Sequence, residues 1–238
     1  MRGFFVAGTD TGVGKTEVAR ALLSLLRGAV PLKPVETGSA PDRPEDALAL
    51  LRASGGTFDL DQVCPYRFRL SAAPLVAAEA EGKAISVERI EQVVARAAPR
   101  AVVVEAAGGL LVPLAREVAS LTLEQADPAE RAPAAALVTN LDLAERLGLP
   151  VLLVGRAGLG TLNHCGLSAE ALARRGVELR AIVLNRVVPE DDPSVATNAR
   201  LVEELTGAMV LGPTPFIADA SARPAAIAIA LARLVGGG

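Results

Sequence analysis

Short apolar runs alternate with amphipathic stretches from one end of the chain to the other. The runs are continuous, which is typical of β-strands that are covered on both faces. A strand is predicted at each of Gly3–Gly8, Ala29–Val35, Ala101–Glu105, Val151–Gly155, Leu179–Asn185 and Ala208–Gly212. Pro31 and Pro34 interrupt the second run, because proline cannot donate to a sheet ladder.

Between these runs, apolar residues recur at helical spacing, as Val18, Leu22 and Leu25 do after the first strand. Ser86 stands where a helix N-cap is expected, and Glu88 would complement the helix dipole in the first turn. Helices are predicted at Lys15–Arg27, Glu45–Ala53, Val87–Ala98, Leu162–Arg175, Ser194–Thr206 and Ala225–Val235.

This alternation predicts an α/β fold with three layers, in which helices cover both faces of a mostly parallel sheet joined by right-handed crossovers. Ligands bind such sheets at the carboxyl ends of the strands. Binding residues are therefore expected just after Val6, Lys33, Val104, Val154 and Leu184. No composition shift marks a boundary, so residues 1–238 are predicted to form one domain, with Asp127–Ala136 as a surface insertion.

The segment Gly8–Thr16, GTDTGVGKT, joins the first predicted strand to the first predicted helix. A glycine-rich loop in this place points backbone N–H groups at an anion, and the helix N-terminus adds partial positive charge. Lys15 would reach the β- and γ-phosphates, and the Thr16 hydroxyl would bind Mg²⁺. Although five residues rather than four separate Gly8 from Gly14, the context predicts a fold of the P-loop nucleoside triphosphate hydrolase type.

Two acids and a second lysine accompany this loop. Glu105 ends the run AVVVE, where P-loop proteins place a second metal-binding acid, and Asp46 stands in the first turn of a predicted helix. Mg²⁺ binds through one or two carboxylates together with phosphate oxygens and water. Lys33 precedes Pro34, which favours an extended backbone that points the lysine towards the phosphates. Each residue also has a simpler interpretation as a solvated charge or, for Asp46, a partner of the helix dipole.

Composition restricts the remaining chemistry. The chain has 238 residues, a net charge of −3 and 21% charged residues, which is typical of a globular protein without an electrostatic footprint for nucleic acid. A single histidine, His164, excludes a multi-histidine metal site, and we predict that it is a packed or interface residue. Cys64 and Cys165 form no CxxC pair. No apolar run reaches the ~20 residues that span a membrane. We therefore expect a reduced, cytoplasmic protein without nucleic-acid or membrane partners.

Five blocks, in this order, resemble the dethiobiotin synthetase family. They are GTDTGVGKT at 8–16, KPVETG at 33–38, EDALAL at 45–50, VEAAGGLLVPL at 104–114 and LGTLNH at 159–164. The resemblance implies an ATP- and Mg²⁺-dependent cyclo-ligase that joins CO2 to 7,8-diaminopelargonic acid through a carbamate and a carbamic-phosphoric anhydride. It also implies a homodimer with the small-molecule diamine at the interface.

The resemblance further implies residue roles. Lys15, Lys33 and Thr11 would be catalytic, and Thr16, Asp46 and Glu105 would hold Mg²⁺. The ATP site would comprise Gly12, Val13, Gly14, Lys15, Thr16, Glu17, Asp46, Glu105, Ala106, Ala107, Gly108, Asn185, Arg186 and Pro215, with Asn185 recognising adenine. The substrate site would comprise Thr11, Lys33, Thr37, Gly108, Gly109, Leu159, Gly160, Thr161, Leu162 and Asn163.

In the family, a segment like Leu159–Asn163 offers its helix N-terminus to the carboxylate of the substrate bound to the other subunit. Exposed N–H groups after Gly160 favour an anion without the family argument, although an ordinary helix cap is the alternative. The chain departs from the family in three places. Gly12 stands where some members carry a longer or acidic residue, Thr37 replaces a serine, and the stretch from Ala115 to Arg146 is longer than expected.

Three other functions remain open at this point. A dimerising switch ATPase of the partition or division-site type has a similar fold, but its loop carries a second lysine where this chain has Asp10. An amidating synthetase of cobalamin assembly would add a glutaminase domain with a Cys-His pair. A nucleotide-binding protein without turnover is disfavoured by the intact set of Lys15, Thr16, Asp46 and Glu105.

Overall fold

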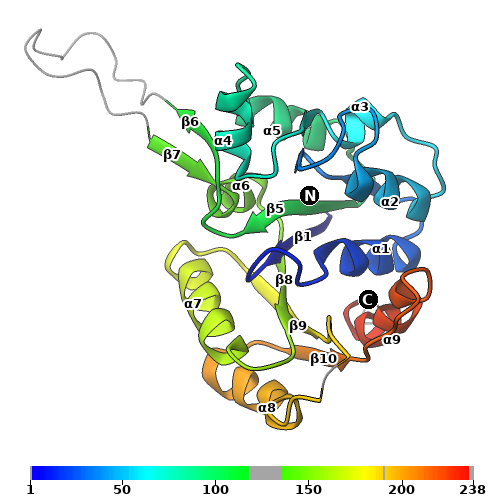
Figure 1. Cartoon of the computed structure of the whole chain (residues 1–238), viewed down its shortest axis with the longest axis vertical. Helices are drawn as coiled ribbons and strands as arrows, with labels where there is room; N and C mark the ends of the chain where they lie inside the picture. The colour runs from blue at the N-terminus through cyan, green and yellow to red at the C-terminus, as the bar shows by residue number, and fades with distance from the viewer. Residues whose placement is uncertain (1, 118–135, 190, 236–238) are drawn as a thin grey trace, which may run out of the picture.

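The computed structural model describes residues 2–117, 136–189 and 191–235. Within them, the central sheet has six strands in the order β10-β9-β8-β1-β5-β2, and each neighbouring pair is parallel. The strands are β1 (Gly3–Gly8), β2 (Val30–Leu32), β5 (Val102–Gly109), β8 (Val151–Arg156), β9 (Leu179–Asn185) and β10 (Val210–Thr214). The predicted parallel sheet is confirmed, with β1 in its interior (Figure 1).

The prediction of one strand over Ala29–Val35 was wrong. The chain leaves the main sheet at Lys33, whose N–H donates to the carbonyl of Val63, and Pro34 has no N–H with which to continue the ladder. Val35 then begins a second strand, β3 (Val35–Thr37), which pairs with β4 (Tyr66–Phe68) in a separate parallel sheet. Lys33 therefore lies between two sheets.

The predicted helices are confirmed to within about three residues at their ends, as α1 (Lys15–Leu25), α2 (Glu45–Ala53), α5 (Val87–Ala95), α7 (Thr161–Arg174), α8 (Val195–Thr206) and α9 (Arg223–Val235). Three further helices were not predicted, because their few residues show too little periodicity. They are α3 (Leu60–Val63), α4 (Pro74–Ala80) and α6 (Asn140–Leu147).

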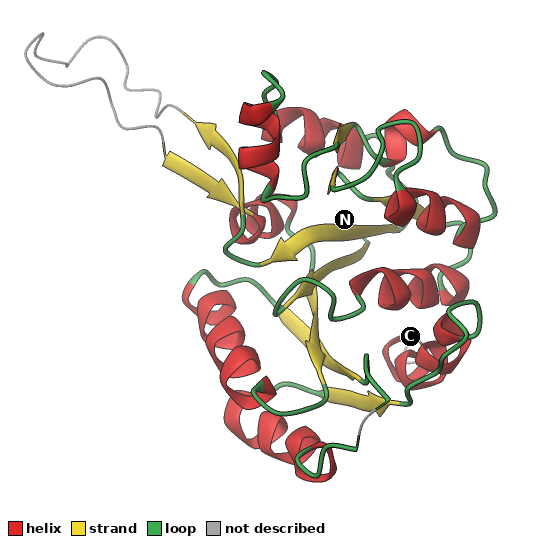
Figure 2. Cartoon of the chain, viewed as in Figure 1, coloured by secondary structure: helices red, strands yellow, loops and turns green. Residues whose placement is uncertain are grey.

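Neighbouring residues of the central strands enter two different cores, since side chains alternate across a sheet. Phe5 and Val104 pack with α5, α6, α7 and α8, whereas Val6 and Val103 pack with α1, α2 and α9. The predicted three layers are confirmed, with helices on both sides of the strands (Figures 1 and 2). Among the described residues, none of the helices combines the length and the apolar character required to cross a bilayer.

An antiparallel pair extends from the main body beyond β5. It consists of β6 (Pro113–Glu117) and β7 (Ala136–Thr139), which the sequence pattern did not predict. The predicted insertion Asp127–Ala136 lies outside the described residues except for Ala136, which begins β7, and so does most of the extra length between Ala115 and Arg146.

Candidate active site

The loop after β1 wraps around the start of α1. Gly14 is the N-cap of α1 and has a φ of 92°. A Cβ at this position would lie 2.1 Å from Nδ2 of Asn185, so only glycine fits between the loop and β9. The loop therefore packs closely against β9 at Gly14, the residue that directly precedes Lys15 and Thr16.

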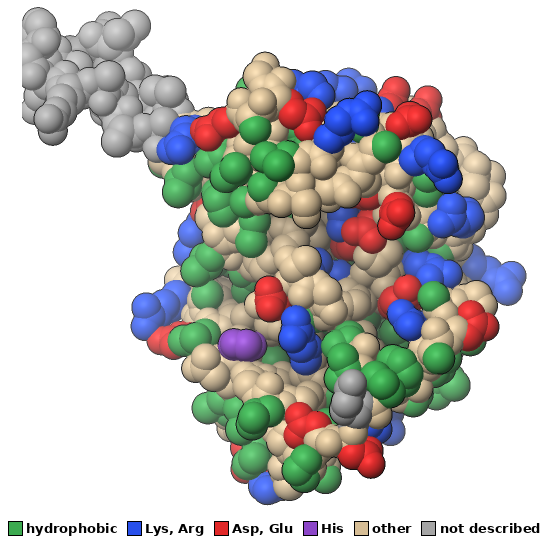
Figure 3. Space-filling model, viewed as in Figure 1, with side chains coloured by type: hydrophobic (Ala, Val, Ile, Leu, Met, Phe, Trp, Pro, Cys, Tyr) green, Lys and Arg blue, Asp and Glu red, His purple; other side chains and the backbone are tan. Residues whose placement is uncertain are grey.

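A cavity of about 790 Å³ opens at the carboxyl ends of β1, β5 and β9. Acidic and basic side chains gather in a hollow on the face shown in Figure 3. Many of the predicted site residues line the cavity, namely Thr11, Gly12, Gly14, Lys15, Thr16, Glu17, Lys33, Thr37, Asp46, Glu105, Ala107, Gly108, Asn185, Arg186 and Pro215.

Other predicted residues do not line this cavity. The side chains of Val13 and Ala106 are buried in the two cores. Gly109 lies in β5 against the main chain of Gly8, where a Cβ would be 3.5 Å from the Gly8 oxygen. The segment 159–163 lies outside the lining altogether.

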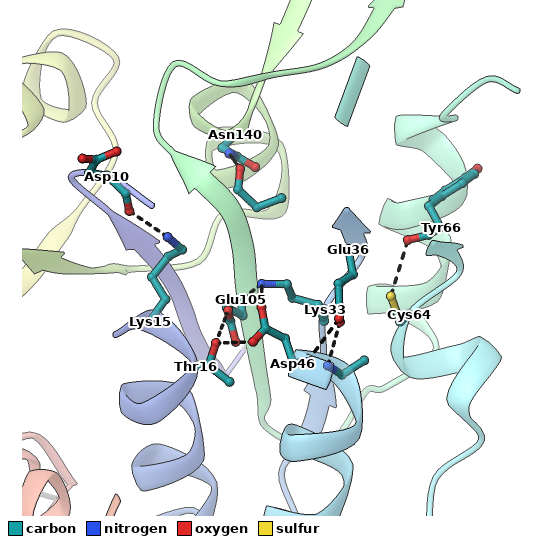
Figure 4. A network of polar contacts seen from close by, with 12 residues as sticks. Asp10, Lys15, Thr16, Lys33, Glu36, Asp46, Cys64, Tyr66, Glu105 and Asn140 are labelled. Atoms are coloured by element: carbon teal, nitrogen blue, oxygen red, sulfur yellow. Dashed lines mark hydrogen bonds and ion pairs between the residues drawn. The ribbon is translucent and has the colours of Figure 1, made fainter. Parts of the chain in front are cut away.

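The predicted metal residues meet at the centre of the cavity (Figure 4). The Thr16 hydroxyl is 2.8 Å from Oδ1 of Asp46 and 2.9 Å from Oε1 of Glu105. Lys33 Nζ donates to Oδ2 of Asp46 at 2.9 Å and to Oε1 of Glu105 at 2.5 Å. Residues from α1, α2, β5 and the β2–β3 connection thus form one network, although Thr16 and Glu105 are 89 positions apart.

Burial and neighbouring charges together set the pKa values of Lys33, Asp46 and Glu105. Burial alone would lower the pKa of Lys33, but the Glu105 and Asp46 carboxylates outweigh it and raise that pKa. Burial alone would raise the pKa of Asp46, but Lys33 holds it below its usual value. For Glu105 burial prevails and raises the pKa. Lys33 therefore remains a cation throughout the physiological pH range.

One oxygen of this network has no protein partner. Glu105 is 1% exposed, and its Oε2 accepts no hydrogen bond. An unpaired buried carboxylate oxygen beside a hydroxyl and a second acid fits Mg²⁺, which takes oxygen ligands and completes its shell with phosphate and water. In the described part of the chain no three His, Cys, Asp or Glu side chains form a metal cluster, so this site would depend on ligand oxygens.

Lys15 lies on the other side of the loop. Its Nζ donates to the main-chain oxygen of Asp10 at 2.8 Å, and its side chain is 7% exposed. Burial, followed by the nearby charge of Lys33, lowers the pKa of Lys15 to about 8. An anionic phosphate at the loop would reverse this effect, because it favours the charged amine.

The end of the cavity near β9 and β10 carries the predicted base-binding residues. Asn185 donates from Nδ2 to the Val13 carbonyl at 3.0 Å and accepts from the Thr214 hydroxyl at 2.6 Å. Its amide thus ties the loop to β10. Arg223 was not predicted, whereas Phe216 belongs to the segment GPTPF around Pro215, which the family resemblance places on the other wall of the base pocket. Arg223 donates to the carbonyl of Ile217 at 2.6 Å and lies over the ring of Phe216, and all three residues line the cavity.

The carboxyl end of β5 is held by a residue that the motifs did not indicate. Nδ2 of Asn140, the first residue of α6, donates to the carbonyls of Ala107 and Gly109, each at 2.8 Å. Gly108 has a φ of 82°, which other residues rarely adopt. The only sequence signal near Asn140 is the capping box formed by Thr139 and Asp142, which indicates a helix start but no contact with a distant strand.

The segment Leu159–Asn163 forms the N-terminus of α7, with Gly160 as N-cap. Leu159 is 87% exposed, and its N–H donates to Oδ2 of Asp192 at 2.6 Å. The Thr161 side chain is buried and lies 3.4 Å from the Cys165 sulfur, so its hydroxyl faces the core. His164 is exposed on α7 rather than packed in the core.

Known proteins resemble the chain over nearly its full length. A family described as an AAA domain matches residues 2–129 and 124–223. The protein named ATP-dependent dethiobiotin synthetase BioD from Anaeromyxobacter dehalogenans (strain 2CP-C) is 48% identical over 98% of each chain. The protein of the same name from Bacillus subtilis (strain 168) is 32% identical over 92% of this chain and 89% of its own. A solved ParA family ATPase from Chlorobium tepidum TLS aligns with 100% of this chain and 93% of its own, at 13% identity and a TM-score of 0.48.

Proposed function

The chain belongs to the dethiobiotin synthetase family, and we infer from that membership that it catalyses the ATP-dependent formation of dethiobiotin. The observation that carries this inference is the match at 48% identity over 98% of the chain. The enzyme is therefore a ligase of biotin biosynthesis that acts on a small-molecule substrate. The clustering of Thr16, Asp46 and Glu105 with Lys33 supports it from the chemistry of the site.

We propose the following reaction sequence. One amine of 7,8-diaminopelargonic acid attacks CO2 and loses a proton, which gives a carbamate. A carbamate oxygen then attacks the γ-phosphorus of ATP and ADP leaves, which forms a carbamic-phosphoric anhydride. The second amine attacks the anhydride carbon, and phosphate leaves as the cyclic urea closes. The protein need not supply a nucleophile, since the substrate brings both amines.

The charged residues would stabilise the negative charge of these steps. Lys15 is proposed to bind the β- and γ-phosphates, and Lys33 to neutralise the carbamate and the transferring phosphoryl group. Mg²⁺, held by Thr16, Asp46 and Glu105, would supply further neutralisation of phosphate charge when bound. The contacts of Lys33 with both acids support its assignment, because the same ammonium aligns the two carboxylates.

Substrate and base contacts are proposals of the same kind. Thr11, Thr37 and Gly108 line the cavity and are proposed to contact the diamine and the carbamate. Glu17, Arg186 and Pro215 line its nucleotide end, where Asn185 is proposed to recognise adenine. Asn185 retains a second N–H on Nδ2 for this role, because only one donates to Val13. We also propose that the chain forms a single domain.

We further propose a homodimer in which α7 of one subunit completes the site of the other. The segment 159–163 carries a highly exposed leucine and lies outside the cavity of its own chain, which supports a role towards a second copy. Because the Leu159 N–H already donates to Asp192, the amides that follow Gly160 would bind the substrate carboxylate.

Subunit complementation tests this dimer. Lys15→Ala removes the phosphate contact, and Gly160→Asp places a carboxylate at the α7 N-terminus, so each variant alone is expected to be nearly inactive. Co-expression should restore about one quarter of wild-type activity. Random pairing places about half of all active sites in heterodimers, and in each heterodimer one site carries both substitutions while the other carries neither. Activity that stays at the level of the single variants would contradict a shared site.

The function itself is tested by incubating the purified chain with ATP, Mg²⁺, bicarbonate and the diamine. The expected result is a cyclic urea, detected by mass spectrometry, with one ADP and one phosphate per product. ¹³C-bicarbonate should label the urea carbon. ATP hydrolysis that neither requires the diamine nor yields the urea would instead favour the switch ATPase, which the lack of a lysine at position 10 already disfavours.

A further inference from the structure

The helix that carries Asp46 starts without a cap of its own. The N-cap of α2 is Pro44, whose backbone is extended and whose side chain offers no hydrogen-bond acceptor. The first N–H groups of a helix have no partner within the helix and are usually met by the N-cap side chain, which accepts from the second or third residue. In α2 these residues are Asp46 and Ala47.

Both N–H groups are met by a carboxylate from another element. Glu36 lies in β3 and is 4% exposed. Its Oε1 accepts from the Asp46 N–H at 3.2 Å, and its Oε2 accepts from the Ala47 N–H at 2.9 Å (Figure 4). A negative charge at this place also complements the positive end of the helix dipole. Glu36, in β3, thus takes the place of an N-cap side chain for α2.

Asp46 is therefore held at both ends. Its main-chain N–H is bound by Glu36, and its carboxylate is bound by Thr16 and Lys33. The exposed fraction of the Asp46 side chain is 41%, so packing alone does not hold it in place. Without Glu36, two N–H groups at the start of α2 would lose their partners and the first turn would fray.

We propose that Glu36 is a positioning residue for the metal site, which caps α2 so that the Asp46 carboxylate stays aligned with Thr16 and Glu105. The inference rests on the metal set proposed above. Glu36 also lines the cavity, so the competing explanation is direct contact between its carboxylate and a ligand. The two explanations differ in whether another cap can replace Glu36.

The first test is nucleotide binding by the whole chain with and without Mg²⁺. The probe is an ATP analogue with an imido bridge, titrated calorimetrically. Glu36→Ala is expected to weaken Mg²⁺-dependent binding by about 10- to 100-fold, the usual effect of removing a group that orients a metal ligand. Binding in EDTA should change little, because the glycine-rich loop does not contact Glu36. Glu36→Gln keeps one acceptor and should lose less than Glu36→Ala.

The decisive variant adds a local cap. Pro44→Ser places a hydroxyl at the N-cap position, where serine accepts from the N–H groups that Glu36 now holds. In the double variant Glu36→Ala with Pro44→Ser, we expect most of the Mg²⁺-dependent affinity to return. Ser86→Ala is the matched control, since Ser86 caps α5 by accepting from Arg89 and lies away from the cavity. It should lose stability without losing Mg²⁺-dependent binding.

Two outcomes would overturn the proposal. The first is unchanged Mg²⁺-dependent affinity in Glu36→Ala. The second is a double variant that folds, as judged by circular dichroism, but recovers no affinity, together with a Glu36→Gln variant as weak as Glu36→Ala, since a direct ligand contact would need the carboxylate itself. Binding does not require turnover, so these results are independent of whether the chain forms dethiobiotin.

Discussion

Replacing Lys33 by methionine is expected to lower kcat by about 10²- to 10³-fold, the usual effect of removing one group that stabilises developing charge. Methionine keeps most of the side-chain volume but removes the cation. The Glu105 and Asp46 carboxylates would then face each other with only the Thr16 hydroxyl between them. The cavity would lose the positive charge that faces the phosphoryl group, and the Asp46 and Glu105 carboxylates would lose the ammonium that aligns them.

The same variant should also be less stable. Breaking a buried ion pair by removing one partner costs about 3 to 5 kcal/mol of unfolding free energy, and here Lys33 and Glu105 are 4% and 1% exposed. Urea titrations followed by circular dichroism measure this loss. Mg²⁺ with ADP should restore part of it, because a divalent cation replaces the missing charge. Lys83→Met is the control, since its pair with Glu81 is exposed. Wild-type turnover in Lys33→Met would remove Lys33 from the mechanism.

Lys15→Met is expected to produce a similar loss of turnover with the opposite effect on stability. The amine of Lys15 is buried beside Lys33, which lowers its pKa to about 8. Below that pH the folded chain holds a desolvated cation that methionine would remove. Without nucleotide, Lys15→Met should therefore be at least as stable as wild type at pH 7. Nucleotide affinity should fall strongly, because the loop loses its point charge for the phosphates.

The lowered pKa also predicts how binding depends on pH. Lys15 loses its proton as the pH rises through about 8, whereas an unfolded lysine keeps it to about 10.5. Phosphate binding favours the charged form of Lys15. Near pH 8 the protein should therefore take up protons when ADP binds, and ADP should bind more weakly at higher pH. Calorimetry in two buffers of different ionisation enthalpy measures the uptake, and Lys15→Met should abolish it. Uptake that is equal in the variant would show that another group titrates.

In the absence of ligand, the Lys15 contribution to stability rises with pH between 8 and 10.5, because the unfolded chain binds more protons there.

Local patterns were enough to predict the sheet and most of its helices. A continuous apolar run shows a strand covered on both faces in its own few residues, and GTDTGVGKT shows its strand–loop–helix context in the same way. Short helices such as α3 and α4 were missed, because they contain less than the two or three turns from which a period can be measured. The split between β2 and β3 was missed for a related reason. Pro34 signals an interruption, but which sheet the chain joins afterwards depends on a partner strand 31 positions away.

The sequence by itself determined which residue types reach the active site, because the carboxyl ends of parallel strands must meet at one edge of the sheet. Only the tertiary structure decided how those residues are held. Glu36 caps α2 from β3, Asn185 ties the loop to β10, and Asn140 fixes the carboxyl end of β5. These are contacts between polar atoms distant in sequence, from 10 positions for Glu36 to 172 for Asn185. No periodicity or motif encodes such pairs, since each depends on the packing of whole elements, whereas a strand or a phosphate loop is specified by its own neighbouring residues.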